Sequence, residues 1–186
     1  MNRKEITKLL TDTLINTRLN DRKYYATEVT LDYGTAHPKR IDVMEFKPKG
    51  VVHVSDIEKG KFICYEIKSC KEDVYSGNGL NFFGEENYIV TTMETYKDLQ
   101  DDIRSGKLHN YIREHHPESQ TNFGFLVAIP EWIDARINKL IHSEYENPSL
   151  FTKDEKWKLY KMMPCIKQGR KRSLVELLFC MLRSGN

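Results

Sequence analysis

The sequence predicts an α/β (α+β) domain in which helices flank a central mixed β-sheet. Three observations carry this prediction. They are a helical apolar pattern near the N-terminus, a series of β-rich segments after it, and a continuous apolar run at residues 123–130. The 186 residues suit one domain, since single cores usually span about 100 to 200 residues. With 39% apolar residues, the composition is that of a folded globule.

The first half of the chain predicts one helix followed by an antiparallel three-stranded meander. Residues 4–19 have apolar side chains three and four positions apart, the pattern of a helix with one buried face. Three β-rich segments follow, and Gly34, Pro38 and Gly50 suit reversals between them. These segments cover residues 24–33, 40–46 and 61–69.

The second half alternates strands and helices. Residues 70–86 contain three glycines without a clean period, which predicts a short helix and then an exposed loop. The run at 123–130 is typical of a strand buried on both faces. The other predicted elements are a strand at 87–92 and helices at 93–106 and 133–141. Phe82 and Phe83 are either base-stacking side chains of the loop or core residues, and we expect at least one in the core.

Residues 148–186 are predicted to form a helical extension of a core that spans residues 1–147. Two capping boxes support this, Thr152 with Glu155 and Ser173 with Glu176. The last helix is apolar on almost every side, so it must be buried in its own fold or against a second subunit. A homodimer is therefore one expectation.

Charge and cysteine content limit the classes of function. The net charge of +2 gives little overall attraction to a polyanion, which must then be met by a local basic patch. The cysteines form no C-x-x-C pair, so we expect reduced thiols: Cys64, Cys70, Cys165 and Cys180. The first residues lack the apolar segment of a signal peptide, and the sequence has no run of about 18 apolar residues that could span a membrane. We therefore expect a cytoplasmic protein without a membrane partner.

Charged residues interrupt two of the predicted strands. Glu66 and Lys68 are two apart in "FICYEIKSC", so they share one face of the strand. Asp42 stands between apolar residues in "RIDVMEF", and pairing of the two strands would bring it close to Glu66. Two adjacent carboxylates repel each other unless a cation lies between them. Mg²⁺ fits, because it takes oxygen ligands and commonly uses one or two carboxylates. Lys68 would then orient the attacking water or stabilise charge on a phosphate.

These residues resemble the motif of the PD-(D/E)XK nuclease superfamily, whose core is an α-β-β-β-α-β arrangement. The matching segments are "RID" at 40–42 and "EIK" at 66–68, and the longer phrasing is most similar to the MmcB-like branch linked to DNA repair. The namesake proline is absent, because Ile41 precedes the Asp. The resemblance covers roughly residues 1–145.

The resemblance implies a restriction-endonuclease-like fold and a Mg²⁺- or Mn²⁺-dependent deoxyribonuclease. Asp42 and Glu66 would bind the metal with the backbone carbonyl of Ile67, Lys68 would be the catalytic lysine, and Glu28 would be an outlying first acid. The similarity to the MmcB-like branch implies a role in DNA repair, and a phage or mobile-element context is a separate expectation. Two alternatives stay open: a catalytically inactive nuclease-fold module that binds DNA, and a set of structural ion pairs with no metal.

Other charged and aromatic residues are weaker candidates. Glu45 could be the third acid in place of Glu28, and Asp73 could reach the site from its loop. His115 and His116 are adjacent and have no Cys or Glu at zinc spacing, which disfavours zinc. The residues expected to contact the DNA backbone or stack on a base are Lys167, Arg170, Lys171, Arg172 and Tyr75.

Overall fold

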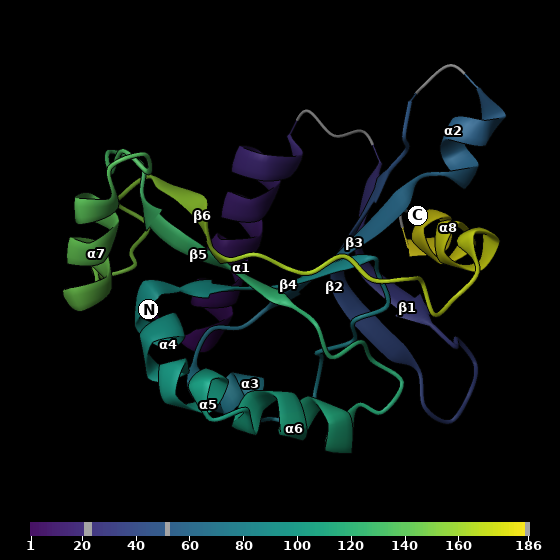
Figure 1. Cartoon of the computed structure of the whole chain (residues 1–186), viewed down its shortest axis with the longest axis horizontal. Coiled ribbons are helices and arrows are strands. Elements are labelled where there is room, and N and C mark those ends of the chain that lie inside the picture. The colour runs from purple at the N-terminus through teal and green to yellow at the C-terminus, as the bar shows by residue number, and fades with distance from the viewer. Residues whose placement is uncertain (21–23, 51–52, 185–186) are drawn as a thin grey trace.

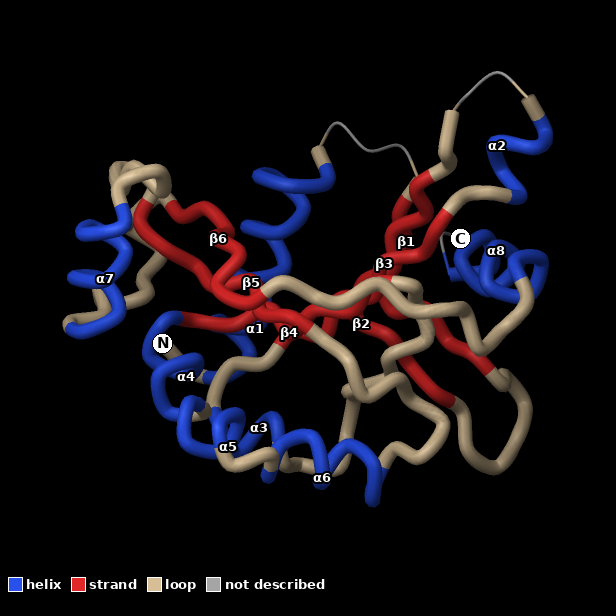
Figure 2. The backbone as a smooth tube through the Cα atoms, viewed as in Figure 1, coloured by secondary structure: helices blue, strands red, loops and turns tan. Residues whose placement is uncertain are grey.

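A six-stranded mixed sheet forms the centre of the molecule, with helices on both faces (Figures 1 and 2). The computed structural model describes residues 1–20, 24–50 and 53–184. The strands follow one another across the sheet in chain order, from β1 to β6. The predicted class, a mixed α/β domain with a flanked mixed sheet, is confirmed. Within the described residues, none of the helices is long and apolar enough to span a membrane.

The sheet changes from antiparallel to parallel pairing at its centre. The first three strands form the predicted antiparallel meander: β1 (Tyr25–Leu31), β2 (Lys39–Lys47) and β3 (Lys61–Ile67). The next two run parallel to β3: β4 (Glu86–Thr92) and β5 (Gly124–Pro130). The last strand, β6 (Trp157–Met163), is antiparallel to β5. All seven residues of β5 are buried, as the continuous apolar run predicted.

The helices follow the predicted order, with two additions, one in the meander and one at Lys107–His115 before β5. Helix α1 (Arg3–Leu14) continues into the π-helical turn η1 (Ile15–Leu19). The short helix α2 (Val54–Glu58), which the sequence did not predict, precedes β3. Helix α7 begins later in the chain than predicted. The remaining helices are α3 (Lys71–Val74), α4 (Met93–Asp98), α5 (Gln100–Arg104), α6 (Lys107–His115), α7 (Asn138–Glu146) and α8 (Leu174–Ser184).

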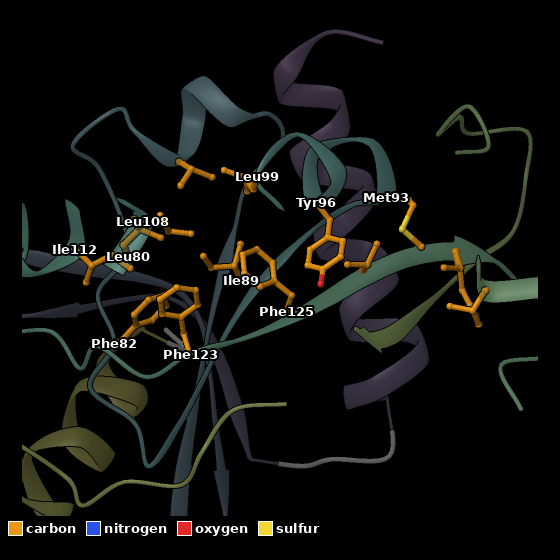
Figure 3. Close-up of a cluster of buried hydrophobic side chains, with 14 of the residues drawn as sticks. Leu80, Phe82, Ile89, Met93, Tyr96, Leu99, Leu108, Ile112, Phe123 and Phe125 are labelled. Carbon is orange, nitrogen blue, oxygen red and sulfur yellow. The ribbon is translucent and has the colours of Figure 1, made fainter. Parts of the chain in front are cut away.

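Three apolar clusters divide the two faces of the sheet. On one face α1 packs on β3 to β5, where Leu10 and Leu14 meet Tyr65 and Val90. The other face carries two clusters. Helices α4 to α7 cover β4 and β5 there, with Phe82 and Leu108 in the packed layer (Figure 3).

Helix α8 covers the remaining part of that second face, over β1 to β3. Leu177 and Met181 are buried against this end of the sheet, in the same cluster as Phe83. Because Phe82 and Phe83 are both buried, the expectation that at least one belongs to the core is confirmed.

The prediction of a wholly helical extension is wrong for residues 157–163, which form β6 at the edge of the sheet. Two successive residues in the middle of this segment face different sides: Leu159 packs with the α1 cluster, and Tyr160 with the opposite one. That period of two belongs to a strand. The Thr152 capping box falls in a turn. Ser173, in contrast, caps α8, because its Oγ accepts a hydrogen bond from the Glu176 N–H at 3.1 Å. Residues 185–186 of the predicted extension lie outside the described residues.

Only one side of α8 is buried in the monomer. Leu177, Cys180 and Met181 face the sheet, whereas Val175 and Phe179 are exposed. The fold therefore does not bury this helix on all sides. The homodimer stays a prediction.

Candidate functional site

A row of three carboxylates crosses the first three strands at one end of the sheet, close enough for their charges to interact. Val29 pairs with Ile41 and Thr27 with Val43, so Glu28 lies opposite Asp42. The pairing of β2 with β3 ends at Val43 and Tyr65, and just beyond it the Asp42 carboxylate accepts the Ile67 N–H at 2.7 Å, which places Asp42 beside Glu66. The fold thus brings together the three acids that the sequence singled out.

Glu66 is fully buried at the centre of this row, and its two carboxylate oxygens have different surroundings. Oε1 accepts the backbone N–H of Asn81 at 3.1 Å. Oε2 is buried without a hydrogen-bond partner in the part of the chain that the structure describes. Burial raises the pKa of Glu66 to about 8, and repulsion by Asp42 adds to this while Lys68 opposes it. A buried, orphaned carboxylate oxygen is costly to a fold and points to a missing partner.

Asp42 is held in place by the backbone of the neighbouring strand. Its Oδ2 accepts the N–H of Ile67 at 2.7 Å. Burial raises the pKa of Asp42 and the charge of Glu28 raises it further, whereas the Ile67 hydrogen bond and Lys68 lower it. The contact to Asp42 comes from the N–H of Ile67, so a ligand role for the Ile67 carbonyl stays a prediction.

Lys68 lies just beyond the end of β3 and is almost fully buried. Its backbone is fixed on both sides, because its N–H donates to the Val90 carbonyl at 2.9 Å and its carbonyl accepts the Thr91 hydroxyl at 2.6 Å. Its Nζ donates to the carbonyl of Asn78 at 2.7 Å. The ammonium charge favours the ionised forms of Asp42 and Glu66. The side chain thus adds a positive charge beside two carboxylates.

The loop at residues 77–81 closes over Glu66 and Lys68. Gly79 has a φ of +74°, and a Cβ there would lie 2.6 Å from Glu66 Oε2 and 2.7 Å from Lys68 Nζ. Glycine is the residue that takes this left-handed backbone without strain and leaves room for so close an approach. Asn81 fixes the end of the loop, because its Nδ2 donates to the Arg40 carbonyl at 2.7 Å. The loop therefore separates Glu66 from solvent.

A cavity of about 710 Å³ opens beside this row of acids. Asp42, Lys68 and Glu28 line it, whereas Glu66 lies beneath the loop. Asp73 also lines the cavity. Although burial raises it, hydrogen bonds from Ser69 bring the pKa of Asp73 below its usual value.

The two candidates for the third acid lie in different places. Glu28 is exposed, has a left-handed φ of +54°, and forms an ion pair with Arg40 at 2.8 Å. Glu45 is buried on the opposite face of β2, where the Tyr65 hydroxyl donates to it at 2.7 Å. This position removes Glu45 from the row of acids. Glu28 is the acid that stays beside Asp42.

His115 and His116 line the same cavity, which the sequence reasoning missed. They lie at the end of α6, far from Glu66 along the chain. No local pattern links them to the strands, because their position depends on how α6 packs across the sheet. Only the tertiary structure could place them here.

Three of the four predicted basic DNA contacts bond to other parts of the chain. Their partners are the Glu85 carboxylate for Arg170 (3.2 Å), the Ser119 carbonyl for Lys171 (3.0 Å) and the Asp32 carboxylate for Arg172 (2.8 Å). Lys167 is exposed. These contacts fasten the segment before α8 to the domain. A role in DNA binding stays a prediction for all four.

Tyr75, the predicted base-stacking residue, is part of the packing around α6. Its hydroxyl donates to Asp102 at 2.9 Å, and its ring lies edge-on to that of Tyr111. These contacts hold the ring against its own domain, and stacking on a nucleic-acid base stays a prediction.

Comparison of the chain with family models, with curated proteins and with solved structures found no match. In the residues described by the structure, no group of three or more His, Cys, Asp and Glu side chains is arranged to hold a metal ion.

Proposed function

We propose that the chain is a metal-dependent nuclease that hydrolyses phosphodiester bonds in DNA. The observation that carries the proposal is the position of Asp42, Glu66 and Lys68 side by side at one end of the sheet, next to a large cavity. Two repelling carboxylates and a buried ammonium group are costly in a strand unless they have a chemical task.

The carboxylates fit a hard divalent cation, Mg²⁺ or Mn²⁺. Glu66 Oε2 is buried without a hydrogen-bond partner among the described residues, and the pKa values of both Glu66 and Asp42 are raised. A cation between the two carboxylates would give Glu66 Oε2 a partner and would lower both raised pKa values. We assign Asp42 and Glu66 as its protein ligands, with the Ile67 carbonyl as a third oxygen. When bound, the metal supplies a Lewis acid for the scissile phosphate.

Lys68 is the residue that would act on the attacking water. Its Nζ is bonded to a neutral carbonyl, that of Asn78, which an incoming water or phosphate oxygen can replace. An ammonium group in a buried site stabilises developing negative charge more strongly than one in solvent. Glu28 stays an outlying acid, because its ion pair with Arg40 must open before it can take part.

The element order supports the same class of nuclease. A helix, an antiparallel meander and a parallel strand reached through α3 follow the α-β-β-β-α-β arrangement of the PD-(D/E)XK core that the motif resembles. The resemblance to the branch linked to DNA repair supports a role in repair, and a phage or mobile-element context is the alternative role. All four cysteines are free thiols, which supports a reducing, cytoplasmic location.

One observation favours a second candidate, a nuclease-fold module that binds DNA without cleaving it. Glu66 is completely covered, and Gly79 approaches its free oxygen closely. If the loop at 77–81 never opens, the metal cannot reach Glu66, and the domain would act by binding alone.

The deciding experiment is calorimetric titration of Mg²⁺ and Mn²⁺ beside cleavage assays on single-stranded, duplex and branched DNA. The variant is Glu66→Gln, which keeps shape and removes charge. Glu45→Gln is the matched control, because Glu45 is also buried but lies on the opposite face. The proposal requires metal uptake and cleavage in the control and loss of both in Glu66→Gln. Tight DNA binding with neither metal uptake nor cleavage in the wild type would select the second candidate.

A further inference from the structure

Three cavity residues carry hydrogen-bond donors that the proposed metal chemistry does not use. Lys39 stands at the start of β2, and His115 and His116 stand at the end of α6. Lys39 Nζ lies 3.8 Å from the half-exposed carboxylate of Glu118, the outer limit of an ion pair. A pair this long and exposed contributes little, so the ammonium group remains available to another anion.

The His116 side chain is almost fully buried at the edge of the cavity. The residue is 7% exposed, and its Nε2 has no hydrogen-bond partner within the described part of the chain. Burial lowers the pKa of His116, and the positive charges of Lys39, His115 and Lys68 lower it further. The same charges that oppose a proton on this ring attract an anion toward it. A ligand atom is thus the missing partner that best fits the surroundings.

The His115 ring is held in place by Tyr111 of the same helix. Its Nδ1 lies 3.1 Å from the Tyr111 carbonyl oxygen, and its ring stacks on the Tyr111 ring with 4.2 Å between the ring centroids. Because a carbonyl only accepts, Nδ1 is the donor of this bond and Nε2 is the nitrogen left for a ligand; Nε2 donates to a phosphate oxygen in the imidazolium form, in which both ring nitrogens carry a proton. The stacked ring loses little freedom on binding, which favours affinity.

The segment that carries the histidines is fastened to the loop over Glu66. The Ser119 hydroxyl donates to the Leu80 carbonyl at 2.8 Å and accepts the Phe82 N–H at 3.2 Å. Between these two residues, the Asn81 N–H donates to Glu66. A ligand held by the histidines is therefore held at a fixed position relative to the carboxylates.

We infer that Lys39, His115 and His116 form a phosphate subsite that holds the backbone of a DNA strand beside Asp42 and Lys68. Phosphodiester oxygens accept several hydrogen bonds at once and favour a positive surface. The carboxylates would repel such a backbone, so donors elsewhere in the cavity are needed to keep it in place. The inference rests on the proposed function, because it takes the strand to be the substrate of the nuclease.

The test measures binding of a fluorescein-labelled single-stranded DNA of about 12 nucleotides, within the usual range of single-strand site sizes, by anisotropy in EDTA and at several salt concentrations. The variants are Lys39→Ala, His115→Ala and His116→Gln, with folding checked by circular dichroism. Lys47→Ala is the matched lysine control, because Lys47 is exposed at the other end of β2. His142→Ala is the matched histidine control, since His142 is exposed on α7.

Each subsite variant should bind roughly tenfold more weakly, the order expected for losing one charge-assisted hydrogen bond. Lys39→Ala should also reduce the salt slope by about 0.7, the value for one phosphate of a single strand. Both controls should bind like the wild type. The inference is overturned if Lys39→Ala and His115→Ala bind as tightly as their controls.

The two proposals can fail separately. Weaker binding by Lys39→Ala and His115→Ala in a protein that neither takes up Mg²⁺ nor cleaves DNA would keep the subsite and reject the nuclease. Cleavage that depends on Asp42, together with unchanged binding by these two variants, would keep the nuclease and reject the subsite.

Discussion

Replacing Gly79 with alanine tests whether the loop at 77–81 is closed over the two central charged residues. The new Cβ would lie 2.6 Å from Glu66 Oε2 and 2.7 Å from Lys68 Nζ, well inside normal contact distance. Alanine at a left-handed φ costs about 1 to 2 kcal/mol. Moving the loop outward also breaks the hydrogen bond from Lys68 to Asn78. That loss adds roughly 1 to 3 kcal/mol.

Gly77→Ala supplies the matched control. Gly77 has nearly the same φ, +79°, but a Cβ there meets nothing within 4 Å. Its substitution therefore carries only the backbone cost of about 1 to 2 kcal/mol. The free energy of unfolding, measured by urea denaturation without divalent metal, should fall by roughly 1 to 3 kcal/mol more for Gly79→Ala than for Gly77→Ala.

Equal destabilisation by the two variants would refute the closed loop. In that case the methyl group added at position 79 finds space without displacing Glu66 or Lys68, and the burial of Glu66 would need another cause. A larger loss of unfolding free energy for Gly79→Ala, with the dependence on urea concentration unchanged, would support the close approach of Gly79 to Glu66 and Lys68.

Three further predictions concern pH and assembly. Without metal, the wild type should lose stability relative to Glu66→Gln as the pH rises from about 4 to about 8. The reason is that the pKa of Glu66 is raised in the folded state, so ionisation of its carboxyl group opposes folding. Urea denaturation of both proteins across this pH range checks the prediction. Hydrogen bonding to Lys71 lowers the pKa of Asp102 to about 2. Asp102 should therefore add about 1 to 2 kcal/mol to the free energy of unfolding above about pH 4, and this contribution should disappear as the pH falls through about 2. The free energies of unfolding of the wild type and Asp102→Asn should then become equal. If α8 forms the expected homodimer, Phe179→Asp should make the protein monomeric in sedimentation, whereas dimers in that variant would exclude this face.

The central strands could be predicted from sequence because their signals are local. Alternation along residues 40–46 and 61–69 identifies β2 and β3, and turn residues between them imply antiparallel pairing. From that pairing alone, Asp42 could be placed near Glu66. The two acids therefore follow from the same periodicity that defines the strands.

The segment at 157–163 was misread because its lysines and aromatic residues obscure the alternation. An edge strand is stabilised by pairing with its neighbour, here β5, and that pairing leaves little trace in the sequence. The closure of the loop over Glu66 and the position of α6 beside the cavity also depend on contacts between residues far apart in the sequence. Gly79 reads as an ordinary flexible residue until its distance from Glu66 is known.

The position of the site follows from the change of pairing at β3. Strand β3 pairs antiparallel with β2 on one side and parallel with β4 on the other, and the chain after β3 crosses to β4 through α3 and the loop at 77–81. On the face opposite α1, helix α8 packs over β1 to β3 and helices α4 to α7 pack over β4 and β5. The two apolar clusters on that face therefore cover different halves of the sheet, and Glu66 and Lys68 lie where the chain leaves β3 between them. Ligands of open α/β sheets commonly bind beyond the carboxyl ends of strands, and Lys68 lies just past the carboxyl end of β3. Charged residues can be retained there because they fall outside both apolar layers, and loop 77–81 then decides whether Glu66 is reached from the cavity.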